Sequence, residues 1–460
     1  MSRITVGSGS LSALLILGAC DASRSIDPLP PPGQVSSARD VGFELELVRE
    51  VRALAEAKGV GQLAPRPLVR RPLVRLGQAL AFDPLLSGTR DISCMTCHVP
   101  GFGTGDGKSL SIGQGGSGLG PARSHPQGVF IPRNAPPLFN LADMRRLFWD
   151  GRVEVDGQGT LHTPAGAHLT DDMKQVFEFG AISALAMFPV TNRFEMRGFS
   201  GNELAEIADD DFTAIWQALM ARLGAVGEYR GLFLAAYPGT RFEDMTFAHA
   251  SNAIAAFFID QLSSANSPWD RFLAGNDRAL TTLQLEGAKT FLSLRCVECH
   301  NGATFSDQEF HNVAVAQVGP GQGNGFEGRD DFGRMNVTGN PAEIYRFRTT
   351  PLRNVELTAP YGHDGAILDL REFIEHYSES HLKLLAFDDS RLEPLLRGTT
   401  VANATDILLH RDPILDGVVL PSDLVDKLMD YIGALTDPAA RNLNHVIPLR
   451  VPSGLPVIRP

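Results

Sequence analysis

The residues of this sequence best suited to chemistry are two pairs of cysteines, each followed directly by a histidine. The two C-x-x-C-H motifs consist of Cys94, Cys97 and His98 and of Cys296, Cys299 and His300. Two thiols at this spacing can bond the vinyl carbons of one haem, and the adjacent imidazole then reaches the iron. The motifs therefore predict two covalently attached c-type haems, with His98 and His300 as the proximal ligands of the two irons.

Cysteine pairs of this kind have two other common uses. One is a disulfide or a thioredoxin-like redox pair, and the other is a zinc site made from four cysteines. A zinc site would leave both histidines without a role, and a thioredoxin-like motif requires a βαβ context that the surrounding sequence lacks. Haem attachment is therefore preferred. It predicts an exported protein, because haem is joined to such cysteines outside the cytoplasm.

The fifth cysteine, Cys20, ends an N-terminal stretch with the features of an export signal. Arg3 supplies a positive charge, an apolar run follows from Leu11 to Leu17, and small residues precede Cys20. We interpret residues 1–20 as a lipoprotein signal peptide, Cys20 as the lipidated residue and residues 21–40 as a tether. A plain secretory signal with an incidental cysteine is the alternative. The expected location is the periplasm of a Gram-negative bacterium, as a membrane-anchored lipoprotein.

Length, charge and hydropathy narrow the possibilities further. The chain has 460 residues, of which 43% are hydrophobic, enough to bury two ordinary cores. Its formal net charge of −12 argues against a nucleic-acid partner, because binding phosphates requires clustered cations. After residue 20, no stretch reaches the roughly 18 consecutive apolar residues of a membrane helix. We therefore expect two domains that meet the membrane through the lipid anchor alone.

Helices must position most of these residues, because strand signals are few. Apolar side chains recur at helical spacing in residues 41–57, 203–221, 246–262, 282–294 and 422–435. Two stretches dense in glycine and proline, 99–137 and 317–341, are expected to be long loops. One haem motif falls in each half, with a boundary near 237–244. We expect a mainly α fold with an N-terminal haem domain (41–240), a C-terminal haem domain (241–440) and a tail (441–460).

Over residues 75–436 the sequence resembles the bacterial di-haem cytochrome c peroxidases and MauG, the di-haem enzyme of methylamine utilisation. The matching segments are 76–78, 82–87, 92–94, 132–134, 148–152, 267–271, 351–355 and 358–365. The tail segments 445–448 and 451–456 resemble the MbnH branch, whose members act on a copper-binding partner protein. The resemblance implies two cytochrome c-like haem domains that face each other, long Gly/Pro-rich loops, and one calcium ion between the haems.

Two positions of this resemblance concern the first haem. Where peroxidases that need reductive activation have a distal histidine, this sequence has Gln114. An amide ligates ferric iron poorly, so the first haem is expected to be open to peroxide; ligation by His125 is the alternative. Glu195 matches the family's distal carboxylate, which moves a proton as the O–O bond breaks. A solvated surface glutamate is the alternative there, and Leu185 stands where the family has a distal glutamine.

The distal ligand of the second haem is expected to be Tyr377. It lies fourteen residues after His363, where the peroxidases place a methionine and MauG a tyrosine. The apolar spacing of residues 369–377 puts Tyr377 on the inner face of a predicted helix, whereas His376 points about 100° away. On spacing alone a core tyrosine is the better interpretation, and the family offset favours the ligand. A phenolate ligand favours ferric iron and lowers its potential.

Two further sites follow from the resemblance. Trp149 matches the tryptophan between the two haems, where an aromatic ring can relay electrons or holes; a plain core aromatic fits its burial preference equally well. Asn134, Thr358 and Pro360 match the inter-haem calcium site, which uses a side-chain amide and backbone carbonyl oxygens. A satisfied turn is the alternative for those three residues.

The sequence therefore predicts a haem-dependent oxidoreductase of the peroxidase type. In the preferred hypothesis it uses hydrogen peroxide to oxidise a residue, a tryptophan, on an exported, copper-binding, MbnP-like partner protein. In the alternative it is a di-haem cytochrome c peroxidase that reduces hydrogen peroxide with electrons from a small cytochrome. A lipid-anchored electron carrier is the third hypothesis, and a six-coordinate first haem that does not react with peroxide would indicate it.

Overall fold

Helices are the main regular structure of the protein, a computed structural model that describes residues 38–459. Residues 1–37, which include the predicted signal peptide, Cys20 and most of the tether, lie outside the described residues. The chain divides after Glu44 into two compact units, and the description that follows is of the second unit. The described strands are two or three residues long, so the prediction of a mainly α fold is confirmed.

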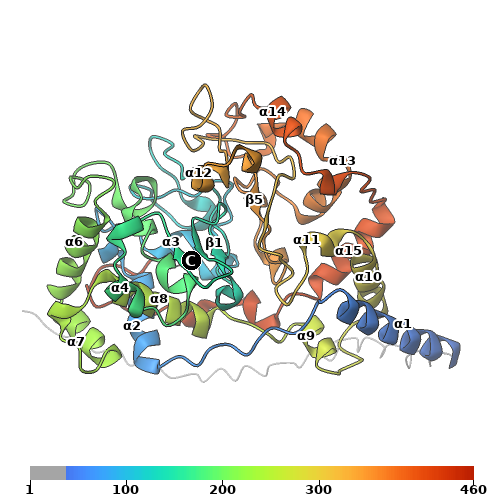
Figure 1. Cartoon of the computed structure of the whole chain (residues 1–460), viewed down its shortest axis with the longest axis horizontal. Coiled ribbons are helices and arrows are strands. Elements are labelled where there is room, and N and C mark those ends of the chain that lie inside the picture. Colours follow the sequence, from blue (N-terminus) through green and yellow to red (C-terminus); the bar gives the residue numbers. More distant parts are fainter. Residues whose placement is uncertain (1–37, 460) are drawn as a thin grey trace, which may run out of the picture. The chain divides into compact units, whose positions relative to one another are not determined.

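The helices, in chain order, are α1 (Ala38–Ala57), α2 (Arg71–Phe82), α3 (Cys94–Cys97), α4 (Asp171–Gln175), α5 (Ala181–Leu185), α6 (Phe212–Gly224), α7 (Gly227–Ala236), α8 (Phe247–Gln261), α9 (Pro268–Leu273), α10 (Thr282–Ser293), α11 (Cys296–Cys299), α12 (Met335–Thr338), α13 (Leu370–Leu385), α14 (Ala404–Leu409) and α15 (Ser422–Gly433). The strands are β1 (Arg146–Leu147), β2 (Val153–Val155), β3 (Leu161–His162), β4 (Phe310–His311) and β5 (Phe347–Arg348). They form an antiparallel sheet β1-β2-β3 and an antiparallel pair β4-β5. Within the second unit, Figure 1 shows α2 to α8 on one side, and α10, α11, α13 and α15 on the other.

Four of the five predicted helices lie within three residues of their expected bounds. Helix α1 starts at Ala38 and so includes the end of the predicted tether. The fifth prediction, 203–221, is wrong at its start, because α6 begins at Phe212. Asp211 is the physical reason: its carboxylate accepts a hydrogen bond from the amide of Ala214 and caps the helix at that point.

The first core is built around the crossing of α2 and α8. Leu73, Leu76 and Leu80 of α2 are fully buried, and α8 is buried along nearly its whole length. A Cβ atom added to Gly77 would lie 1.8 Å from the carbonyl oxygen of Ala253. The two helices can therefore approach this closely only because residue 77 is a glycine.

A similar crossing, between α10 and α15, organises the second core. A Cβ atom added to Gly287 would lie 2.0 Å from the carbonyl oxygen of Lys427. Trp269 packs edge to face against Tyr431 beside this crossing, with ring centroids 5.1 Å apart. Phe291 packs against the same tyrosine at 5.4 Å. Both cores thus rest on one close helix pair with a glycine at the contact.

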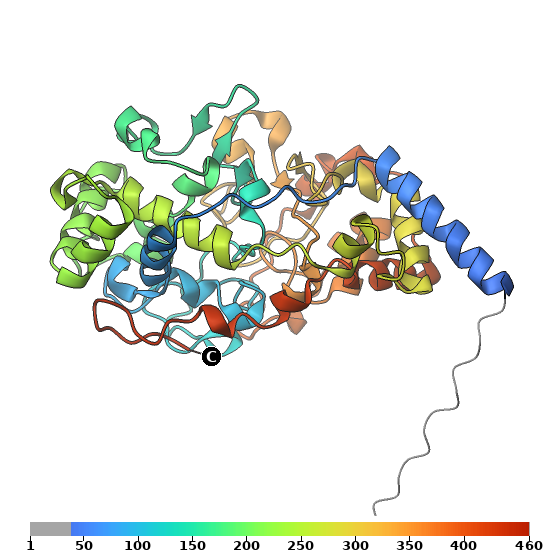
Figure 2. The same ribbon diagram turned by 90° about the horizontal axis from the view of Figure 1, so that it is seen from below.

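The two cores do not divide at the predicted boundary near residue 240. Helix α8 packs in the first core, although it follows that boundary, and residues 47–60, which precede it, pack in the second. The predicted tail also returns to the first core, where Val446 and Val451 are buried and the Ser453 hydroxyl donates to the Asp83 carboxylate at 2.7 Å. Figure 2 shows this C-terminal segment in red. The apolar faces of the helices therefore decide which core a segment joins.

The backbone that follows the first C-x-x-C-H motif contains little regular structure. Between Phe102 and Leu141 it contains one short 3-10 helix, Gly120–Ala122. No helix in the described part of the chain combines the length and the apolar character needed to cross a membrane.

Candidate active site

The first C-x-x-C-H motif occupies the one-turn helix α3 and the residue after it. The amide of Ser93 donates to the Thr96 hydroxyl at 3.0 Å, which fixes the start of this turn. Nδ1 of His98 lies 3.0 Å from the carbonyl oxygen of Thr104. A carbonyl can only accept, so Nδ1 carries the proton and Nε2 of the neutral imidazole keeps its lone pair. His98 is thus held with Nε2 available as a metal ligand.

The second motif, on α11, has the same arrangement. Nδ1 of His300 lies 3.0 Å from the carbonyl oxygen of Phe305, so it also carries the proton and leaves the lone pair on Nε2. Thr104 and Phe305, which supply the two carbonyls, both have a positive φ, 62° and 58°. That conformation is uncommon outside glycine. The two imidazoles are therefore oriented in the same way, each by the backbone carbonyl of a nearby residue with a positive φ. The sequence analysis did not predict these contacts.

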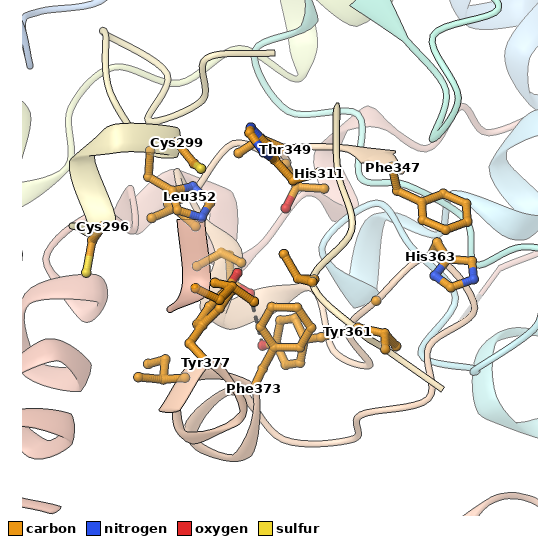
Figure 3. A pocket seen from close by; sticks show the side chains of 18 of the residues that line it. Cys296, Cys299, His311, Phe347, Thr349, Leu352, Tyr361, His363, Phe373 and Tyr377 are labelled. Atoms are coloured by element: carbon orange, nitrogen blue, oxygen red, sulfur yellow. Dashed lines mark hydrogen bonds between the residues drawn. The ribbon is translucent and has the colours of Figure 1, made fainter. Parts of the chain in front are cut away.

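Each motif borders its own cavity. The larger cavity, about 340 Å³, is lined by all three motif residues of 296–300, and the smaller one, about 130 Å³, by all three of 94–98. Figure 3 shows Cys296 and Cys299 projecting from α11 at the edge of the larger cavity. The other side chains around both cavities are mostly apolar. Such walls suit a large, flat, apolar cofactor.

The environment of the thiols does not suit the alternative uses of the cysteines. Burial raises the pKa of Cys94 to about 12 and that of Cys296 to about 11, so these thiols are neutral and not reactive thiolates. All four motif cysteines are free of disulfides. Among the described residues, the only group of three potential metal ligands is Cys299, Asp307 and His311, and it contains a single cysteine. The residues therefore fit one covalently attached haem in each cavity.

Four residues line both cavities and separate them: Asn134, Pro137, Trp149 and Arg348. The indole Nε1 of Trp149 donates to the carbonyl oxygen of Asn134 at 2.9 Å, and the side chain is buried. The structure therefore brings Trp149 into the wall that the two cavities share. Its role as a relay stays a prediction.

Glu195 reaches the smaller cavity from a π-helical turn, Arg193–Arg197. The Asn192 side chain caps this turn by accepting hydrogen bonds from the amides of Phe194 and Glu195, at 2.8 and 3.2 Å. The Glu195 side chain is 20% exposed, which does not fit a solvated surface glutamate. Burial raises the pKa of Glu195, and Arg152, 3.8 Å away, opposes that shift. This carboxyl can therefore hold or release a proton beside the cavity.

Gln114 and His125 are not brought to the smaller cavity. The Gln114 amide donates to the Thr89 hydroxyl at 2.8 Å, and its backbone amide donates to the carbonyl oxygen of Glu195 at 3.1 Å. Among the residues that line this cavity, His98 is the only histidine. Leu185, which stands where the family has a distal glutamine, is also among them. Gln114 thus borders the Glu195 turn and does not contact the cavity itself.

Tyr377 lines the larger cavity together with the second motif, as Figure 3 shows. Burial raises the pKa of Tyr377, and no described residue is a hydrogen-bond partner of its hydroxyl. His376, its neighbour on α13, lies outside this cavity: its Nε2 is 2.8 Å from the carbonyl oxygen of Val313. Of the two candidate ligands on this helix, Tyr377 is therefore the one beside the second motif.

The three predicted calcium ligands, Asn134, Thr358 and Pro360, all line the larger cavity. The Asn134 side-chain nitrogen donates to the carbonyl oxygen of Lys108 at 2.9 Å, which turns its oxygen away from that contact. Within the described residues, the carbonyl oxygens of Thr358 and Pro360 accept no hydrogen bond. Free carbonyl oxygens of this kind fit a hard cation.

Sequence reasoning missed Arg348, which lines both cavities and is 6% exposed. Its guanidinium donates to the carbonyl oxygens of Phe148 and Thr349, at 3.0 and 3.2 Å. No carboxylate forms an ion pair with it in the part of the chain that the structure describes, and burial lowers its pKa to about 10. A buried cation of this kind indicates an anionic partner. The sequence carried no signal for it, because the two cavities come together only in the folded chain.

Comparisons with known proteins agree with this geometry. Residues 71–278 match the family model described as di-haem cytochrome c peroxidase. The cytochrome c551 peroxidase of Pseudomonas aeruginosa is 31% identical over 320 residues, which are 68% of this chain and 74% of the relative. The methylamine utilization protein MauG of Methylorubrum extorquens is 30% identical over 305 residues, 66% of this chain and 68% of the relative.

One solved structure has the same fold with a lower sequence identity. A MauG-like protein associated with microbial copper homeostasis aligns with a TM-score of 0.57 at 23% identity. The alignment covers 82% of this chain and 95% of that protein.

Proposed function

Since the chain belongs to the di-haem cytochrome c peroxidase and MauG family, and is therefore a haem-dependent oxidoreductase, we propose that it uses hydrogen peroxide to oxidise a tryptophan on a partner protein. The family resemblance of the sequence is confirmed. Peroxide as oxidant and the protein substrate are our proposal. The partner is an exported, copper-binding protein of the MbnP kind, which the tail segments of this chain suggest.

The observation that carries this proposal is the Tyr377 hydroxyl in the larger cavity. It has no hydrogen-bond partner among the described residues, and its ring stands beside the second motif. A phenolate on the second iron would favour its oxidised states. An enzyme that passes oxidising equivalents to a distant residue needs such stabilisation, whereas a simple electron acceptor does not.

The residues around the smaller cavity complete the proposal. The C-x-x-C-H motifs would hold two haems, which would supply the iron chemistry that cleaves peroxide and stores its oxidising equivalents. Glu195 takes a proton from the incoming peroxide and returns it to the departing oxygen. Trp149 carries electrons across the wall shared by the cavities. Arg348 neutralises a carboxylate of the bound cofactors.

We extend the proposal to the setting of these sites. Two haem domains would face each other across Trp149, with a calcium ion held by Asn134, Thr358 and Pro360 between them. The chain would act in the periplasm and be anchored through a lipid on Cys20. Replacing Cys20 by serine should then move the protein from the membrane fraction to the soluble fraction.

The proposal is tested by mass spectrometry on the exported protein encoded beside this gene. The purified di-haem protein and peroxide should add oxygen to one tryptophan peptide, followed by loss of a carbon, the signature of kynurenine. The Glu195→Gln variant, treated in the same way, should leave that peptide largely unmodified. An unchanged partner mass after full consumption of peroxide would contradict the proposal.

The second candidate function is peroxide reduction with electrons from a small cytochrome. The similarity to the Pseudomonas aeruginosa cytochrome c551 peroxidase favours it. Rapid, sustained oxidation of reduced cytochrome c by peroxide, with no change in any neighbouring exported protein, would select this function.

Gln114 bears on both functions, because each needs a first haem that is open to peroxide. A resting electron paramagnetic resonance spectrum should show one high-spin ferric haem.

A further inference from the structure

We propose that Tyr345 is a redox-active residue that carries electrons, one at a time, between the larger cavity and the protein surface at α14. The inference rests on the peroxide reaction of the proposed function, and it does not depend on which residue of a partner is oxidised. Neither the sequence motifs nor the family resemblance singled out Tyr345.

The position of Tyr345 is the first observation. Its ring lines the same cavity as Cys296, Cys299 and His300, and the residue is 2% exposed. Its hydroxyl donates a hydrogen bond to the Asp406 carboxylate at 2.6 Å. The Asp406 side chain, on α14, is 48% exposed. One aromatic residue thus connects the cavity wall with a carboxylate that is in contact with water.

The hydrogen-bond partner of Tyr345 separates it from the other phenols. Tyr361 also lines the larger cavity, but its hydroxyl donates to the carbonyl oxygen of Val355 at 3.0 Å, and a backbone carbonyl is a far weaker proton acceptor than a carboxylate. The Tyr377 hydroxyl has no hydrogen-bond partner among the described residues. Tyr229 does donate to a carboxylate, Asp83, at 2.8 Å, but it lines neither cavity. Tyr345 alone combines the cavity wall with a proton-accepting partner.

A second carboxylate reinforces this arrangement. The Tyr345 hydroxyl lies 3.3 Å from Asp330 as well as 2.6 Å from Asp406. Burial and these two carboxylates raise the pKa of Tyr345, so the phenol keeps its proton in the resting protein. Loss of an electron makes a phenol strongly acidic, and a carboxylate within hydrogen-bond distance is then positioned to accept its proton.

The backbone of Tyr345 is also unusual. Its φ is 57°, in the left-handed region that bulky residues rarely adopt. Its amide donates to the carbonyl oxygen of Phe332 at 3.1 Å, and the Phe332 ring packs edge to face on the tyrosine at 5.6 Å. The surrounding residues therefore hold the Tyr345 backbone in a conformation that is unfavourable by itself.

Each electron that leaves Tyr345 is accompanied by transfer of its hydroxyl proton to Asp406. Tyr345 gives one electron to the oxidised cofactor in the larger cavity, its O–H bond breaks, and the proton forms a new O–H bond on Asp406. A one-electron donor outside the protein then returns an electron to the tyrosyl radical, and Asp406 gives the proton back. Two such cycles deliver the two electrons that, with two protons, convert one hydrogen peroxide to two waters.

The test uses the purified di-haem protein, one equivalent of peroxide and no added donor. We expect a tyrosyl radical signal in freeze-quench electron paramagnetic resonance that grows as the oxidised state decays, and that narrows in protein made with ring-deuterated tyrosine. Tyr345→Phe should abolish the signal and lengthen the lifetime of the oxidised state several-fold. Asp406→Asn should weaken the signal, and the matched control Tyr361→Phe should leave signal and lifetime unchanged.

Peroxide consumption, measured in the same samples, separates the possible failures. A wild-type protein that does not consume peroxide would overturn both the proposed function and this inference. A protein that consumes peroxide without forming a tyrosyl radical would overturn the inference alone. So would the same signal and lifetime in Tyr345→Phe as in the wild type.

Discussion

At the scale of single residues, Tyr377 matters because it lines the larger cavity and its hydroxyl has no hydrogen-bond partner within residues 38–459. Burial raises the pKa of Tyr377, so the proton leaves only if a cation replaces it. We expect Tyr377→Phe to keep most of the packing area but to change the ferric spectrum of the second haem. Tyr361→Phe is the matched control, because its hydroxyl, in the same cavity, already bonds the Val355 carbonyl. Visible and electron paramagnetic resonance spectra measure both; a change in the control alone would remove Tyr377 from the ligand set.

Glu195 is the second residue whose chemical role can be tested without changing the shape of its side chain. Its side chain lies beside the smaller cavity and has a raised pKa. Glu195→Gln keeps the shape but loses the proton exchange, so the reaction with peroxide should slow by about 10²–10⁴-fold while the resting spectrum stays the same. Glu206→Gln, at an exposed position, is the control. Stopped-flow mixing with peroxide gives both rates, and an unchanged rate in Glu195→Gln would assign the proton transfer elsewhere.

At the scale of the helices, the two close crossings explain why glycine stands at residues 77 and 287. We expect Gly77→Ala to destabilise the protein by about 1–3 kcal/mol, because the new methyl group would collide with the backbone of α8. Gly231→Ala, inside α7 with open space around it, should be neutral or slightly stabilising, since alanine favours helix. Thermal unfolding of both variants measures the difference. Equal stability of the two would show that α8 can move away without cost.

At the scale of the whole molecule, a buried ion-pair network joins the two halves of the sequence. Arg133 pairs with Asp150 at 2.5 Å and with Asp331 at 2.6 Å, and all three side chains are at most 7% exposed. Burial alone would raise the pKa of each carboxyl, but Arg133, helped at Asp150 by Arg152, outweighs burial and lowers both pKa values below their ordinary range. Arg133 and Asp331 lie 198 residues apart in the sequence, so this network connects sequence-distant parts of the chain.

This network should govern the stability in acid. A carboxyl whose pKa is lowered by folding contributes stability above its unfolded pKa of about 3.9, and the contribution is lost as the pH falls through the folded value. We expect the protein to lose stability steeply below pH ~4, and Asp331→Asn to be less stable at pH 7 by about 3–5 kcal/mol with a shallower loss in acid. Urea unfolding at several pH values measures this. Parallel stability curves for the variant and the wild type would contradict it.

The sequence by itself determined the features whose physics is local. The haem motifs are five contiguous residues each, so attachment chemistry could be predicted without any fold, and helical periodicity located several of the longer helices because an apolar face repeats within one element. Tyr377 was predicted from a helix face and a family offset, and the cavity beside it agrees with that prediction.

Only the tertiary structure decided what depends on packing between distant segments. It brought Trp149 and Arg348 into a wall shared by two cavities, turned Gln114 toward Thr89, and placed Tyr345 between a cavity and Asp406. It also showed that α8 packs in the first core, although α8 follows the predicted domain boundary near residue 240. These outcomes leave no local pattern in the sequence, because an interior contact is set by the summed burial of many residues rather than by neighbours along the chain.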